Sequence, residues 1–169
     1  FTKYLDIVAL GTVADIVPLT GENRKIVKQG LSMIQNCGLI ELLTLCNLQK
    51  DNITAGHIGF IIGPRLNAAG RLKHAGIGVE LLLTEDKIRA HELAVMLDDE
   101  NKIRQQLVEE TFIEAAEMVR QNGYDKSTMI VAAGVNWHQG IIGIVASRLV
   151  DEFYRPAIVI SIGEDGIGK

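Results

Sequence analysis

A long stretch without glycine or proline constrains the fold of this chain more than any other feature. Neither residue occurs from about Glu85 to Gln121. Asp98 precedes Lys102 by four residues, an acid-before-base spacing that favours a helix. We predict one long helix that ends at Gly123 and, because it exceeds the usual helix length, bridges two packing units. Its apolar residues recur at near-helical spacing: Leu93, Leu97, Leu107, Phe112, Ala116 and Val119.

Helices are predicted to dominate the part of the chain before this stretch. The apolar segment 4–14 reads as a buried helix or strand, which periodicity alone does not decide. Asn23 is a possible cap for a helix over 24–35. Shorter helices are expected near 39–46 and 54–62.

The part after the long helix reads as strand, glycine-rich loop, helix and strand. The strands are expected over 128–133 and 157–161, the loop over 134–140, and the helix from there to Val150. This order predicts a βαβ unit with parallel strands, so the fold class is α/β.

Composition narrows the classes of function. The chain has 169 residues and a net charge of −4, so contact with nucleic acid must come from a local basic site. Cys37 and Cys46 have no metal-ligand spacing and are expected to be core thiols. With no apolar run of membrane-spanning length and no signal peptide, we expect a soluble, cytoplasmic protein. Both ends, at Phe1 and at 166–169, suggest a segment of a longer protein.

The segment Gly63–Leu72 combines two arginines and an asparagine with small residues. Arg65 and Arg71 can bind anionic oxygens, and Asn67 would share one helical face with Arg71. The glycines and alanines leave room for a ligand to approach. The segment therefore suits phosphate, although an ordinary helix-to-loop junction with solvated arginines explains it equally well.

Asp15 closes the first apolar segment where a loop begins. A carboxylate there can ligate Mg²⁺ or Mn²⁺ if it faces a cleft, and the same position suits a helix cap or a turn. Asp6 lies inside the apolar run, where a buried acid needs a partner and is either structural or functional. Three histidines show no ligand spacing and are expected to be ordinary surface or core residues: His57, His74 and His91.

A second candidate binding segment runs from Trp137 to Arg148. The amides at the start of its predicted helix, near Gly140, would attract an anion, and His138 and Arg148 can add hydrogen bonds. Three small residues fall on one face and leave it open to a close backbone: Gly140, Gly143 and Ser147. Tight packing of the helix on the sheet through glycine is the alternative.

Three long motifs together resemble a known family. They are LDIVALGTVADIVPL at 5–19 followed by GENR at 21–24, GPRLNAAGRL at 63–72, and NWHQGIIGIVASRL at 136–149. In this order they resemble the RecJ family of bacterial single-stranded-DNA-specific exonucleases, within the DHH phosphoesterase superfamily. The likeness spans nearly the whole chain.

The resemblance implies a domain organisation and an activity. Residues 1–84 would end a DHH catalytic domain, 85–123 would be a connector helix, and 124–169 would begin a DHH-associated domain. The family cleaves single-stranded DNA from its 5′ end, in repair and recombination, with two divalent ions, Mn²⁺ or Mg²⁺.

The resemblance also assigns roles to residues. Asp15 would be a metal ligand, Asn67 and Arg71 would hold DNA near the scissile phosphate with Arg71 neutralising charge, and His138 with Arg148 would bind the strand.

The chain departs from the family pattern in two respects. It contains no DxD and no DHH triplet, and the serine- and arginine-bearing glycine motif expected after Lys169 is absent. Most metal ligands are therefore missing, and we expect the chain alone to be catalytically inert and to hold an incomplete metal site. Two alternatives are a DHH-type phosphodiesterase for oligonucleotides or cyclic dinucleotides, and a non-catalytic module that binds single-stranded nucleic acid.

Overall fold

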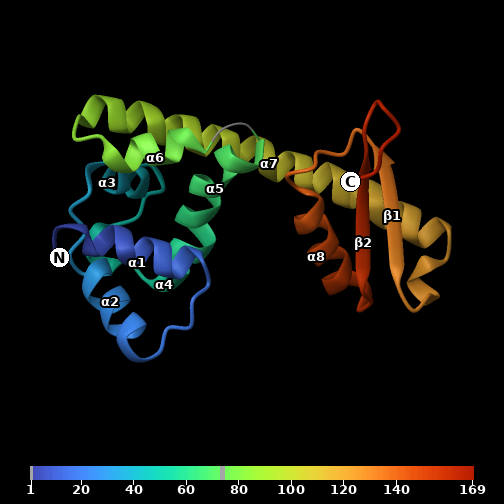
Figure 1. Ribbon diagram of the computed structural model, residues 1–169, viewed down its shortest axis with the longest axis horizontal. Coiled ribbons are helices and arrows are strands. Elements are labelled where there is room, and N and C mark those ends of the chain that lie inside the picture. Colours follow the sequence, from blue (N-terminus) through green and yellow to red (C-terminus); the bar gives the residue numbers. More distant parts are fainter. Residues whose placement is uncertain (1, 73–74) are drawn as a thin grey trace. The chain divides into compact units, whose positions relative to one another are not determined.

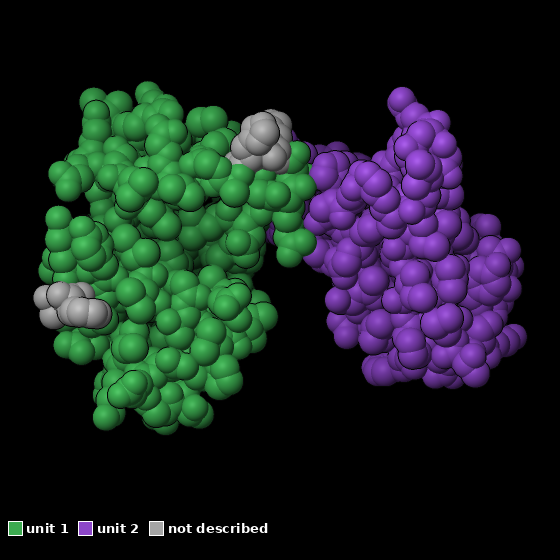
Figure 2. All heavy atoms as spheres, in the orientation of Figure 1, with its two compact units in different colours: residues 1–101 green, residues 102–169 purple. Residues whose placement is uncertain are grey.

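The computed structural model describes residues 2–72 and 75–169, which fall into two compact units. Unit 1 comprises residues 1–101 and unit 2 comprises residues 102–169 (Figure 2). His74 lies outside the described residues. In the part of the chain that the structure describes, no helix is both long and apolar enough to cross a membrane.

Unit 1 is built from helices (Figure 1). They are the 3₁₀ helix η1 (Thr2–Tyr4), α1 (Leu5–Ala14), α2 (Gly21–Leu31), α3 (Cys37–Leu45), the 3₁₀ helix η2 (Lys50–Asn52), α4 (Ala55–His57), the π-helix η3 (Ile58–Ile62), α5 (Gly63–Leu72), α6 (Gly76–Leu83) and the first part of α7 (Lys87–Gln121).

The first apolar segment is a helix, α1, and it packs side by side with α2. Gly30 of α2 permits this approach, because a Cβ there would lie only 2.3 Å from the carbonyl oxygen of Leu5. Leu10, Leu31 and Leu39 are among the side chains of the core that these helices form with α3, α6 and α7.

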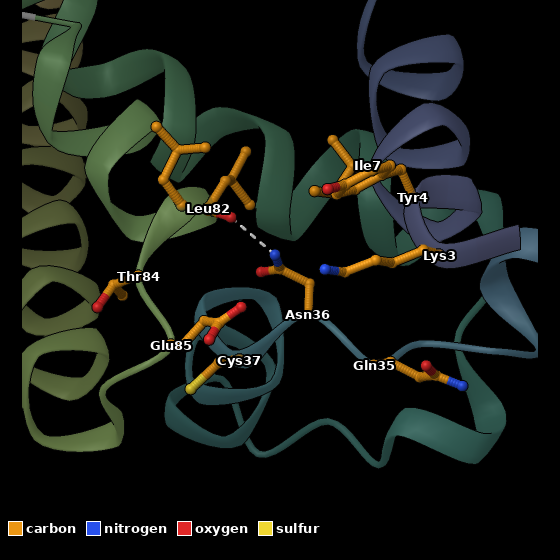
Figure 3. Close-up of a pocket in the computed structure, with 10 residues that line it drawn as sticks. Lys3, Tyr4, Ile7, Gln35, Asn36, Cys37, Leu82, Thr84 and Glu85 are labelled. Carbon is orange, nitrogen blue, oxygen red and sulfur yellow. Dashed lines mark hydrogen bonds between the residues drawn. The ribbon is translucent and has the colours of Figure 1, made fainter. Parts of the chain in front are cut away.

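Asp6 has a structural role in unit 1. Its buried carboxylate accepts hydrogen bonds from the backbone N–H groups of Gln35 at 2.9 Å and Asn36 at 2.8 Å. Asn36 in turn caps α3 and donates to the carbonyl oxygen of Leu82 at 2.8 Å (Figure 3). One buried acid thus fixes the turn between α2 and α3 and, through Asn36, the end of α6.

Two predicted helix boundaries are wrong. The α2 helix begins at Gly21 after Thr20, and Asn23 lies inside it, where its side chain donates to the carbonyl oxygen of Pro18 at 3.2 Å. The helix ends at Leu31 rather than near Gln35, because Asp6 holds the following turn. The helix expected over 54–62 starts as predicted but continues through a π-helix into α5.

The long helix is confirmed as α7 (Lys87–Gln121), and Gly123 follows it with a φ of 68°, a left-handed conformation that suits glycine. The parallel βαβ unit is also confirmed. The strands β1 (Ile130–Val135) and β2 (Ala157–Ile162) pair in parallel, and α8 (Ile142–Phe153) connects them. A short 3₁₀ helix, η4 (Tyr124–Lys126), precedes β1. The fold class is α/β, as the sequence predicted.

Candidate functional site

Asp15 stands at the carboxyl end of α1. Its backbone N–H donates to the carbonyl oxygen of Gly11 at 3.0 Å, and the residue is exposed. Ile16 follows with a φ of 55° and a side chain that is 89% exposed. A β-branched residue in this left-handed conformation is strained by roughly 1–2 kcal/mol. The abrupt end of α1 therefore leaves the Asp15 carboxylate at the surface of unit 1.

The start of α5 lies against this end of α1. The N–H of Gly63 reaches back five residues to the carbonyl oxygen of Ile58, which is the π-helical hydrogen bond of η3. A Cβ on Gly63 would lie 3.0 Å from that oxygen and 3.8 Å from the Cβ of Ala14. Gly63, the first residue of α5, thus lies beside Ala14, the residue that precedes Asp15.

Asn67 and Arg71 follow Gly63 by four and eight residues, which places them one and two turns further along α5, at about 5.4 Å a turn. Both residues are exposed. Asp15 therefore lies at the end of α1 beside which α5 begins, whereas Arg71 lies two turns away, near the other end of α5. The roles of these residues stay predictions.

Arg65 points to a different partner. Its Nε donates to the Asp98 carboxylate of α7 at 2.8 Å, and its Nη1 donates to the carbonyl oxygen of Ile61 at 2.8 Å. The side chains of the ion pair are only 21% and 13% exposed. Arg65 thus fastens α5 to α7, and contact with a phosphate, which stays a prediction, would require this pair to open.

The same pair lies near the half-buried thiol of Cys46. Burial raises the pKa of Cys46 above its usual value; the Arg65 charge opposes this shift and the Asp98 charge adds to it. Cys46 and Cys37 are both free thiols packed at the margin of the core, as expected from the sequence.

In unit 2, the glycine-rich loop leads from β1 to α8. His138 accepts a hydrogen bond at Nδ1 from the N–H of Gly140 at 3.0 Å, so the imidazole shapes the loop. Gly143 has open space where a Cβ would stand, and the hydroxyl of Ser147 donates to its carbonyl oxygen. The face of α8 that carries Gly143 and Ser147 is therefore accessible. Gly140, however, precedes α8 instead of lying on it, and its N–H is already donated to His138, so the phosphate-binding role of this segment stays a prediction.

Arg148 contacts the part of α7 that belongs to unit 2. Its Nη1 donates to Glu109 at 2.7 Å, and its guanidinium lies 3.9 Å from the centre of the Phe112 ring. A strand contact by Arg148 remains a prediction. Trp137 is buried beneath Gly134 and donates from Nε1 to Glu114 at 2.9 Å, so it serves packing.

The described residues offer one candidate metal ligand rather than a complete site. Across 2–72 and 75–169, no group of three or more His, Cys, Asp or Glu side chains could hold a metal ion. His57 takes part in the cap of α4 with Thr54, and His91 lies 3.5 Å from Glu41. Asp15 alone cannot hold two ions, so a two-metal centre would need ligands beyond these residues.

The cavity drawn in Figure 3, of about 450 Å³, is not part of the predicted site. Lys3, Asn36 and Glu85 are among the residues that line it, and it contains none of the predicted metal-binding or phosphate-binding residues. Sequence reasoning missed two exposed apolar side chains close to Asp15 and Gly63, namely Ile16 and Phe60, because nothing in the sequence signals a left-handed isoleucine or a π-helix.

No protein-family model matches the chain. Among curated proteins, it is 47% identical over 171 residues to the single-stranded-DNA-specific exonuclease RecJ of Bacillus subtilis, a match that covers 99% of this chain. It is 40% identical over 174 residues to RecJ of Escherichia coli, again over 99% of this chain. The chain belongs to the RecJ family.

Solved structures of RecJ agree with this assignment. A crystal structure of exonuclease RecJ bound to manganese superposes with a TM-score of 0.84 at 34% identity over 96% of this chain. RecJ from Thermus thermophilus in complex with Mg²⁺ gives a TM-score of 0.82 at 33% identity. The chain spans 22% of the Bacillus subtilis RecJ, 30% of the Escherichia coli RecJ and 41% of the manganese-bound chain.

Proposed function

We propose that this chain is part of a single-stranded-DNA-specific exonuclease that hydrolyses phosphodiester bonds from the 5′ end and acts in DNA repair and recombination. The observation that carries the proposal is the contact between Gly63 and Ala14, because it sets the helix of Asn67 and Arg71 beside the end of α1 that presents Asp15. Relatives named as single-stranded-DNA-specific exonucleases, 35–47% identical to this chain, support it.

The metal requirement follows from the relatives rather than from a site within this chain. RecJ structures contain Mn²⁺ or Mg²⁺, and Asp15, an exposed oxygen ligand, suits either ion. When bound, such ions supply an activated water and neutralise charge on the oxygens of the phosphate. The remaining ligands would come from other parts of the full-length protein.

The residues of this chain would then bind and orient the substrate. Asn67 would donate a hydrogen bond from its amide to a phosphate oxygen, and Arg71 would donate from its guanidinium and offset negative charge. The net charge of −4 makes such local contacts necessary, since the chain as a whole does not attract a polyanion. In unit 2, the open face of α8 would bind the strand.

The proposal is tested with the full-length protein that contains this chain. It should release nucleotides from the 5′ end of a single strand in the presence of Mn²⁺, and it should act poorly on a blunt duplex of the same sequence. Equal or faster cleavage of a dinucleotide or a cyclic dinucleotide would instead favour the DHH phosphodiesterase alternative. Binding of the single strand without cleavage would favour a non-catalytic module.

A further inference from the structure

Phe60 is a large aromatic side chain left in solvent. It belongs to the π-helix η3 and is 87% exposed, whereas Ile58 and Ile62, two residues to either side, are completely buried. A chain that buries these neighbours gains nothing for its own packing by presenting a phenyl ring to water.

The π-helix accounts for this orientation. Ile58 and Ile62 anchor η3 in the core of unit 1, and the residue midway between them is turned to the opposite side of the helix. Single π-helical turns of this kind are uncommon and are frequent at functional sites.

The surface next to Phe60 is free of bulky side chains. At Gly59 a Cβ would meet no atom within 4 Å, and at Gly56 it would meet only the hydroxyl of Thr54, at 3.6 Å. Two glycines beside an exposed ring leave space for a flat group to approach the ring face.

The π-helix that carries Phe60 contacts α1, the helix that ends at Asp15. Phe60 precedes Gly63 by three residues, and Gly63 packs against Ala14 at the end of α1. Ile16, which is 89% exposed, follows Asp15 directly. Exposed apolar groups thus stand on both elements that meet beside the candidate metal ligand.

We propose that the ring of Phe60 stacks on a base of the single-stranded DNA substrate. The inference rests on the proposed function and adds the group that holds a base while Asn67 and Arg71 hold phosphate. Stacking does not depend on sequence, because every base has an aromatic face, and it requires an unpaired base. Phe60 would therefore favour single strands over duplexes.

The test measures binding of single-stranded DNA to the full-length protein with Ca²⁺ in place of Mn²⁺, a condition chosen to limit cleavage. Phe60→Ala should weaken binding by about 5- to 150-fold, and Phe60→Trp should bind as tightly as the unchanged protein. Ile88→Ala is the matched control, because Ile88 is an exposed apolar residue at the start of α7, and its affinity should not change.

A second experiment uses a series of oligonucleotides that each lack one base, at a different position in each. Their affinities for the unchanged protein and for Phe60→Ala distinguish base stacking from other effects of the substitution. At one position the missing base should weaken binding to the unchanged protein but not to Phe60→Ala. An unchanged affinity of Phe60→Ala, or an equal abasic penalty in both proteins at every position, would overturn the inference. Loss of thermal stability with unchanged affinity would also overturn it, by assigning Phe60 to a protein contact.

The inference and the proposed function fail in different ways. If the unchanged protein hydrolyses single strands with Mn²⁺ but shows no coupling between Phe60 and a base, only the inference fails. If the unchanged protein hydrolyses no single strand, the proposed function fails.

Discussion

Gly63 packs against Ala14, and a Cβ at Gly63 would also lie 3.0 Å from the carbonyl oxygen of Ile58. A side chain at this position therefore crowds the carbonyl oxygen of Ile58, whereas its Cβ would make an ordinary van der Waals contact with Ala14 at 3.8 Å. A larger side chain there would act on the start of α5, the helix that carries Asn67.

Gly63→Val should lower kcat/KM for single-stranded DNA by at least about tenfold, because small displacements at a catalytic site are costly. Gly11→Ala is the control, since a Cβ at Gly11 meets nothing within 4 Å and alanine favours a helix by about 1 kcal/mol. Kinetics and thermal unfolding of both variants in the full-length protein check this. Full activity of Gly63→Val would show that the contact does not position the site.

The ion pair between Arg65 and Asp98 should stabilise unit 1. Arg65→Ala and Asp98→Asn should each lower the free energy of unfolding by about 2 kcal/mol, because each removes a charged hydrogen bond from a largely shielded environment. The double variant should lose less than the sum of the two single losses. Denaturant unfolding measures these values, and additive losses would contradict a direct interaction.

Cys46 should be less reactive in the folded protein than in the unfolded chain. Burial raises its pKa, so the folded state retains a proton at an alkaline pH where the unfolded chain has already released it. The associated stability is present below the unfolded pKa and is lost as the pH rises through the folded pKa. The Cys37→Ser variant leaves Cys46 as its one thiol. The rate at which Cys46 is alkylated should rise at a higher pH in the folded variant than in the same variant unfolded in urea.

Arg65→Ala tests the electrostatic effect of Arg65 on the pKa of Cys46. The Arg65 charge lowers the pKa of Cys46, so its removal should move the alkylation profile to still higher pH, as long as the variant remains folded. A shift to lower pH in folded Arg65→Ala would contradict this electrostatic account.

The parts of the fold that depend on local pattern could be predicted from the sequence. The uninterrupted 85–121 stretch predicted α7, and the alternation of strand, glycine loop and helix predicted the parallel pair β1–β2. The sequence predicted a helix for the Asn67 and Arg71 segment, which α5 confirms, while the phosphate-binding role of that segment stays a prediction.

The parts that depend on tertiary contacts could not be predicted. Arg65 pairs with Asp98, a residue 33 positions away in the chain, and no local pattern indicates this partner. The end of α2 depends on Asp6, which lies 29 positions before Gln35. The left-handed Ile16 and the π-helix around Phe60 have no local signature either, because both conformations are imposed by the packing of their neighbours.

We propose that Asp15 serves catalysis and not folding. Asp15 is exposed, so Asp15→Asn should change the free energy of unfolding by less than about 0.5 kcal/mol. The most direct measurement is the Mn²⁺-dependent release of nucleotides from single-stranded DNA by full-length Asp15→Asn, with Asp51→Asn, another exposed aspartate, as control. The account predicts that Asp15→Asn loses turnover by at least about a thousandfold while Asp51→Asn keeps it. Normal turnover by folded Asp15→Asn would contradict the account.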